Sequence, residues 1–143
     1  MDKTELRNEL MAELWRMIKL NLIVNLREFI EGETAALWYI HSCGKNAITP
    51  SQISDNLNIS RARAANILRA LRRKGFVEME IDSVDRRKML VSLTEKGDSF
   101  LDEKYDFLVR YFDLYVDELG EKDITELIRL LRKTSDCNAL LKE

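Results

Sequence analysis

A run of cationic side chains is the part of the sequence with the clearest chemistry. Between Ser60 and Gly75 the chain carries six Lys and Arg residues and no Asp or Glu. Charges of one sign on a single helix repel one another, which destabilises the helix unless an external anion offsets the repulsion. The run therefore predicts a surface that binds an anionic partner. The alternative is a basic face that is merely solvated.

The net charge of the whole chain hides this surface. The 143 residues carry a net charge of −2, which taken alone argues against a nucleic-acid partner. Divided by segment, residues 1–59 carry −2, residues 60–93 carry +5 and residues 94–143 carry −5. The distribution indicates that a polyanion would meet the middle segment, while the acidic segments would face away from it.

Local signals place this run on the second helix of a helix-turn-helix. Thr49–Gln52 is a helix start, in which Thr caps, Pro takes the first helical position and Gln completes a capping box. That helix is short and ends near Asn58. Ser60 caps another helix that reaches Lys74, and Gly75 stops it.

The second helix is predicted to divide into an apolar face and a basic face. Residues at i, i+3, i+4 and i+7 must pack inward: Ala64, Ile67, Leu68 and Leu71. The opposite face combines small residues with Asn and Arg, whose forked polar groups can read adenine and guanine edges. Arginines later on the helix more often meet phosphate. The candidate DNA contacts are Ser60, Arg61, Ala62, Arg63, Ala65, Asn66, Arg69, Arg72 and Arg73. For Asn66, the alternative is a solvated surface amide.

A β-hairpin with a charged tip is predicted directly after this helix. Phe76–Ile81 and Lys88–Leu93 both alternate between apolar and polar residues, and the segment between them is polar and charged. A hairpin in this place can reach an adjacent minor groove, where narrow A·T stretches attract arginine. Arg87 could instead pair with Asp82 or Asp85 and hold the base of the hairpin. The candidate contacts from the tip are Arg86, Arg87 and Lys88.

Together these residues resemble the multiple-antibiotic-resistance regulator (MarR) family. The resemblance is carried by residues 48–77, by Asp82–Lys88 and by Leu93–Gly97, which is similar to the family's Asp-x-Arg-Asp-Arg-Arg wing followed by a strand and Leu-Thr-x-x-Gly. The chain departs from this pattern at Val84, where an arginine is common, so one wing contact is expected to be weaker or absent.

The resemblance implies a fold and a function. The expected fold is mainly α, a winged helix-turn-helix with a three-helix core and a β-hairpin wing, and with long dimerisation helices at both ends. The expected organisation is one domain over residues 1–143, with the winged-helix core at 33–93 and the dimerisation helices at 1–31 and 94–143. The expected function is a homodimeric transcriptional regulator, by family habit a repressor, often released from DNA by a small ligand or an oxidant.

The flanking helices independently favour a dimer. One helix is predicted over residues 3–29, a second from Thr94 to Leu119 with Gly120 at its end, and a third from a capping box at Asp123–Glu126. Their apolar stripes are wider than one small winged-helix core requires. A two-fold dimer would place two recognition helices ~34 Å apart on a pseudo-palindrome.

Aromatic and cationic residues on the flanking helices could line an effector pocket. Family effectors tend to bind between the winged helix and the dimer helices, and aromatic walls with a few cations would suit a phenolic or carboxylate ligand. Plain core packing is the alternative for such residues. The candidates are Trp15, Arg16, Lys19, Trp38, His41 and Tyr111.

Other classes of function find little support in the sequence. The chain has a single His, no Gly-rich phosphate loop, no paired-carboxylate motif and too few ligands for a metal, so we expect no enzyme, no cofactor and no metal. Cys43 and Cys137 are expected to be small buried hydrophobes. The N-terminus is polar and the chain has no long apolar run, which predicts a cytoplasmic protein with no membrane partner. The serious rival is a winged-helix protein-interaction module that docks an acidic partner and does not bind DNA specifically.

Overall fold

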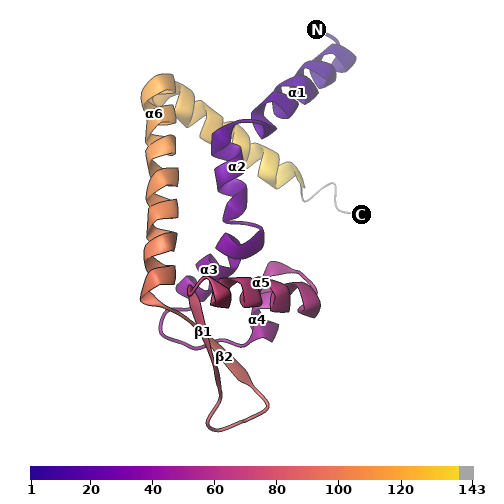
Figure 1. Ribbon diagram of the computed structural model, residues 1–143. Coiled ribbons are helices and arrows are strands. Elements are labelled where there is room, and N and C mark those ends of the chain that lie inside the picture. The colour runs from indigo at the N-terminus through magenta and orange to yellow at the C-terminus, as the bar shows by residue number, and fades with distance from the viewer. Residues whose placement is uncertain (139–143) are drawn as a thin grey trace. The chain divides into compact units, whose positions relative to one another are not determined.

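The computed structural model describes residues 1–138 and contains two compact units, one over Met1–Asp106 and a second that begins at Phe107. The elements along the chain are α1 (Lys3–Ile18), α2 (Asn21–Glu28), α3 (Gly32–Ser42), α4 (Pro50–Leu57), α5 (Arg61–Arg73), β1 (Val77–Ile81), β2 (Met89–Leu93) and α6 (Glu95–Asn138) (Figure 1). Helix α6 begins in the first unit and continues through the second. The predicted fold class, a mainly helical winged helix-turn-helix, is confirmed.

The predicted helix-turn-helix forms with the expected caps. The Thr49 hydroxyl accepts a hydrogen bond from the Gln52 N–H, and the Gln52 side chain accepts one from the Thr49 N–H at 2.8 Å. Helix α4 ends at Asn58, whose φ of 53° is left-handed and turns the chain toward α5. The Ser60 hydroxyl then accepts from the Arg63 N–H at 3.1 Å. Local chemistry therefore fixes where α4 ends and where α5 begins.

The core of the first unit lies where α3, α4, α5 and the hairpin meet. Leu37 of α3, Ile53 of α4, Leu71 of α5 and Val91 of β2 are all completely buried. Leu101, from the first turns of α6, is also buried in this cluster. The burial of apolar side chains from five elements fixes α5 in place, with its other face exposed to solvent.

The wing is an antiparallel hairpin with a short extension that the alternation pattern did not predict. Strand β1 pairs with β2 in a register that places Val77 opposite Leu93 and Ile81 opposite Met89. Ile48, in the loop before α4, bridges to Val91 through two backbone hydrogen bonds of 3.3 and 2.7 Å. The loop that leads into the helix-turn-helix is thereby tied to the middle of β2.

The single N-terminal helix predicted over residues 3–29 is wrong, because the structure has two helices there. Helix α1 ends at Ile18, and Leu20 adopts an extended conformation with ψ of 139° before α2 starts. In α2, Leu22 is buried, whereas no residue of α1 is. The break includes no Gly or Pro, so hydrophobic periodicity alone cannot locate it.

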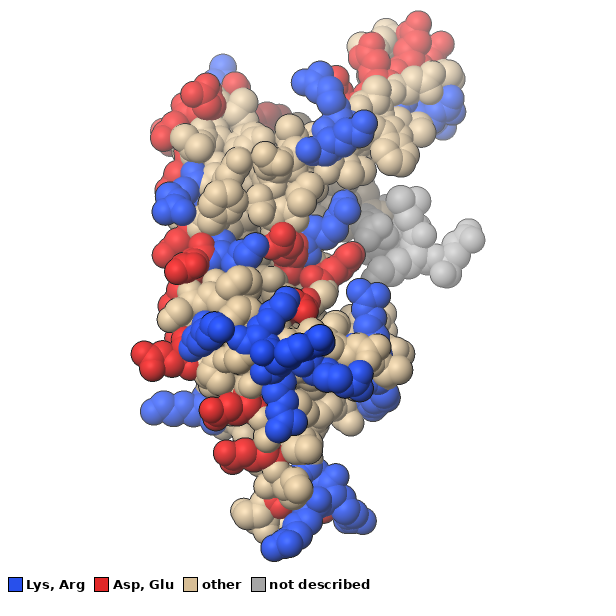
Figure 2. All heavy atoms as spheres, viewed as in Figure 1, with Lys and Arg blue, Asp and Glu red and all other residues tan. Residues whose placement is uncertain are grey.

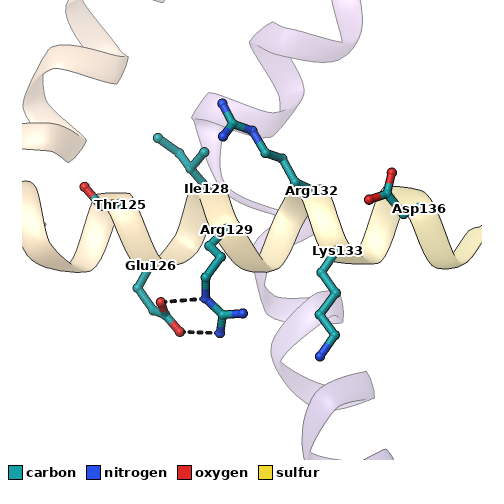
Figure 3. Close-up of a pocket in the computed structure, with 7 residues that line it drawn as sticks. All are labelled: Thr125, Glu126, Ile128, Arg129, Arg132, Lys133 and Asp136. Carbon is teal, nitrogen blue, oxygen red and sulfur yellow. Dashed lines mark hydrogen bonds and ion pairs between the residues drawn. The ribbon is translucent and has the colours of Figure 1, made fainter.

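In the second unit α6 is kinked at Gly120, which has φ of 79° and ψ of 164°. The predicted stop at Gly120 is therefore seen as a break in the helical backbone. The predicted start at Asp123 is wrong, because the helix resumes directly after the glycine. Glu126 does not act as a cap there but accepts two hydrogen bonds from Arg129, at 2.9 and 2.7 Å, which lower the pKa of its carboxyl (Figure 3).

Within residues 1–138, no helix combines the length and the apolar character needed to cross a bilayer.

Candidate nucleic-acid interface

Helix α5 has the two faces that its sequence predicts. The four residues expected to pack inward, Ala64, Ile67, Leu68 and Leu71, are buried. The nine candidate contacts from Ser60 to Arg73 are all exposed. Because the apolar side is fixed in the core, the opposite side must present its Arg and Asn side chains to solvent.

Cationic side chains gather over α5 and at the tip of the β1–β2 hairpin (Figure 2). The tip residues Arg86, Arg87 and Lys88 are exposed, as predicted. Among the candidate contacts within residues 1–138, ion pairs involve only Arg61 and Arg87. The remaining cations of the two elements keep their full charge available to an anionic ligand.

Arg61 is held against α4. One nitrogen, Nη1, donates to the Ser51 carbonyl oxygen at 2.7 Å and to the Asp55 carboxylate at 3.0 Å, and it also contacts the Ser54 hydroxyl. The side chain thus links the first residue of α5 to three residues of α4. Charge-assisted hydrogen bonds of this kind are stronger than neutral ones, so the Arg61 side chain holds α5 against α4.

Asn66 and Arg69 form a pair on the exposed face of α5. The Arg69 Nη1 donates to the Asn66 Oδ1 at 2.9 Å, one helical turn apart. Neither side chain is buried. The two candidate contacts are therefore joined before any ligand binds.

The wing tip is ordered by two aspartates. The Asp85 carboxylate accepts from the Arg87 backbone N–H at 3.1 Å and from its Nε at 3.2 Å, while the Asp82 carboxylate accepts from the Val84 N–H at 3.1 Å. These bonds from Arg87, the backbone bond first, lower the pKa of Asp85. Of the two partners left open for Arg87, the structure has Asp85. Val84, at the position where the resemblance expects arginine, is 92% exposed.

The candidate effector residues are only partly brought together. Trp38 stacks on His41, with ring centroids 5.8 Å apart, and their neighbours include three residues that sequence reasoning missed: Phe29, Asp98 and Tyr105. Three other candidates are exposed on or just after α1: Trp15, Arg16 and Lys19. The last candidate, Tyr111, lies in the second unit beside Phe107. Of these contacts, only the one between Trp38 and His41 could be predicted from the sequence, because residues three apart on one helix lie on the same face.

The cysteines differ from the expectation that both are buried. Cys137 is exposed, and Cys43 is half-buried beside Tyr39. The pKa of the Tyr39 hydroxyl is raised; burial is the largest cause and the neighbouring Cys43 the next. In the portion of the chain that the structure describes, no group of three or more His, Cys, Asp or Glu is placed to hold a metal.

Comparison with known proteins identifies the element that carries this interface. Residues 32–97 match the family model for a winged helix DNA-binding domain. The chain contains a winged helix domain. The winged helix begins at α3 and ends in the first turn of α6, so it includes both α5 and the hairpin. The resemblance inferred from the sequence is confirmed.

Relatives of this winged helix are named as regulators. The chain is 30% identical over 90 residues to the HTH-type transcriptional regulator YwaE of Bacillus subtilis, which is 63% of this chain and 53% of that protein. It is 38% identical over 68 residues to the transcriptional repressor MprA of Escherichia coli, which is 48% of this chain and 39% of that protein. The matches span 39% to 60% of the length of the curated relatives.

Solved structures show the same winged helix fold along the chain. YusO from Bacillus subtilis is 15% identical with a TM-score of 0.76, covering 95% of this chain and 99% of that chain. A variant of MepR from S. aureus bound to an oligodeoxyribonucleotide is 19% identical with a TM-score of 0.67. That match covers 91% of this chain and 96% of the MepR chain. At these identities the likeness establishes the fold of the winged helix and its flanking helices.

Proposed function

We propose that the chain is a sequence-specific, double-stranded DNA-binding transcriptional regulator that acts as a repressor. The observation that carries the proposal is the two-sided character of α5. Its apolar side is buried in the core, so its Arg and Asn side chains face outward without competing acidic residues on the same helix. An α-helix fits the major groove of B-DNA, and exposed small residues such as Ala62 and Ala65 allow its backbone to approach the bases.

The wing supplies the second contact in this proposal. It follows α5 directly and carries Arg86 and Lys88 as exposed cations without an ion-pair partner within residues 1–138. With α5 in the major groove, the hairpin would reach the adjacent minor groove. A MepR variant with this fold was solved bound to an oligodeoxyribonucleotide, which supports DNA as the ligand.

A homodimer reading a pseudo-palindrome is the assembly that we propose. Helix α1 exposes Leu6, Leu10, Leu14 and Trp15 between about 50% and 65%, and the second unit separately exposes Leu131 at 56%. Apolar surface of this extent marks an interface in soluble proteins. Analytical ultracentrifugation should find a dimer at micromolar concentration, and a monomer there would contradict the proposal.

The salt dependence of binding tests DNA against an acidic protein partner. If the dimer contacts six or more phosphates, its DNA affinity should fall about 10³-fold or more between 50 and 200 mM salt. Arg73→Ala should weaken binding to all sequences alike and make the logarithmic salt slope shallower by ~1 for each protomer that binds. The matched control is Arg7→Ala, an exposed arginine on α1, which should leave the slope unchanged.

The outcome separates the two functions. A protein-interaction module would bind DNA weakly and without sequence preference, and Arg73→Ala would not make its salt slope shallower. Selection of bound sequences from random DNA should recover a two-fold site with half-sites about one helical turn apart. Recovery of no common sequence would overturn the proposed function.

Release by a small aromatic acid is a separate part of the proposal. Trp38 is 37% exposed, and its indole stacks on the His41 ring with the centroids 5.8 Å apart. The indole already stacks on Tyr105 at 5.4 Å, so a ligand must compete with contacts within the chain. Benzoate should shift the melting temperature and the DNA affinity, and no change in either at millimolar concentration would count against an effector of this class.

A further inference from the structure

Asn66 and Arg69 together present an unusual hydrogen-bonding surface on the exposed face of α5. A guanidinium has five N–H donors and no acceptor. The amide atom that faces Arg69 Nη1 at 2.9 Å must therefore be the carbonyl oxygen of Asn66. The amide nitrogen keeps both of its N–H donors free for a ligand. The oxygen keeps one lone pair beside the guanidinium, and every other free position of the pair is a donor.

This arrangement changes what Asn66 is able to read. An asparagine that recognises adenine does so with both amide atoms, donating to N7 and accepting from the N6 amino group. In the structure the accepting oxygen is already bonded to a cation. An adenine amino group would have to share that oxygen with the guanidinium, whose N–H groups compete for it.

Guanine suits the pair better. Its major-groove edge presents two acceptors, N7 and O6, and no donor. Two donors from the Asn66 amide, or one from the amide and one from the guanidinium, satisfy both acceptors without leaving a buried group unpaired. The neighbouring Ala62 and Ala65 are exposed and small, so no bulky side chain keeps the pair from the groove floor.

We propose that Asn66 and Arg69 act as one donor unit that selects guanine, and that Arg69 sets this specificity by occupying the Asn66 oxygen. The inference rests on the proposed function and deepens it. Arg69 is then more than a phosphate contact of the kind that its place late on the helix suggests. Its removal should free the Asn66 oxygen and change which base is preferred.

The experiment compares base preferences of full-length variants. Sequences are selected from random DNA by wild type, Asn66→Ala, Arg69→Ala and Arg72→Ala, and affinities are then measured for all four bases at the position where Asn66→Ala loses preference. Wild type should favour guanine over adenine there by ~10-fold or more, the discrimination typical of one good bidentate contact. Arg69→Ala should lower this ratio at least fivefold or reverse it toward adenine.

Arg72→Ala is the matched control, because it removes an exposed arginine one turn further along α5 without touching the Asn66 amide. It should weaken binding to all four bases by a similar factor. An unchanged guanine-to-adenine ratio in Arg69→Ala, or a wild-type preference for adenine, would overturn the donor unit while leaving the proposed function intact. A wild-type protein that selects no sequence would overturn both.

Discussion

Gly97 of α6 lies against the backbone of Phe76, and its replacement by alanine tests how the wing is joined to α6. A Cβ added at this residue would lie 2.1 Å from the carbonyl oxygen of Phe76 and 2.9 Å from the carbonyl carbon. Normal carbon–oxygen contacts are about 3.3 Å or longer. The backbones would have to separate by about 1 Å, and Phe76 O is main chain, which cannot move aside as a side chain could.

The separation would strain three hydrogen bonds that join the two segments. Thr94 N–H donates to the Phe76 oxygen at 3.1 Å, the Thr94 hydroxyl to the Gly75 oxygen at 2.6 Å, and Lys96 Nζ to the Lys74 oxygen at 2.9 Å. Each is worth about 1 kcal/mol net. Overpacking of a tight site costs about 1–3 kcal/mol by itself. We therefore expect Gly97→Ala to lower the free energy of unfolding by about 2–4 kcal/mol.

Urea unfolding at a fixed protein concentration measures this change, because the concentration of a dimer affects its stability. The sign is diagnostic, since helix propensity alone predicts that Gly→Ala in a helix stabilises by up to about 1 kcal/mol. Gly44→Ala is the control: its φ is +63° and a Cβ there meets nothing within 4 Å. It should cost about 1 kcal/mol from the left-handed backbone alone. An equal cost for both variants, or a gain for Gly97→Ala, would refute the reasoning.

Three further predictions concern the turn at Asn58, the link that Arg61 makes between α4 and α5, and the wing. Asn58→Val should lower the free energy of unfolding by about 1–2 kcal/mol because a β-branched residue disfavours a φ of 53°, whereas Asn58→Gly should lie within a few tenths in urea unfolding. Arg61→Met should weaken DNA binding by loosening α5 from α4 without altering the salt slope; a slope shallower by ~1 per protomer would reveal a phosphate contact instead. NMR titration should place the pKa of Asp85 below that of an ordinary carboxyl, with a rise in Arg87→Gln. Because this pKa is lowered on folding, the stabilisation is present above the ordinary value and lost as pH falls through the lowered one; an unshifted Asp85 would contradict the wing geometry.

The parts of the fold that were predicted correctly depend on contacts between near neighbours in sequence. The caps at Thr49 and Ser60 each bond to a residue three positions on, so residue type alone identifies them. The buried face of α5 follows from helical spacing in the same way. The exposure of the candidates on α5 could be predicted because the burial of one helix face leaves the opposite face in solvent.

The parts that were missed depend on partners far away in sequence or on backbone geometry without a residue signal. Ile48 bridges to Val91 across more than forty residues, and nothing in either residue type specifies that pairing. The break at Leu20 uses a residue that is compatible with a helix. Arg61 was predicted to face DNA because its charge is part of the run, yet its carbonyl and carboxylate partners lie on α4.

The six charges between Ser60 and Gly75 differ in how far the chain itself offsets them. Arg61, at the helix end where a cation is disfavoured by the macrodipole, pairs with Asp55, and Lys74 pairs with Glu33 at 2.6 Å. Two arginines of the last turn gain from the same dipole. Arg63, in the first turn of α5, and Arg69, in its third turn, have no carboxylate partner within residues 1–138. A solvated face would need no such distribution, whereas a helix that binds phosphate anions and guanine acceptors would leave these two arginines unpaired.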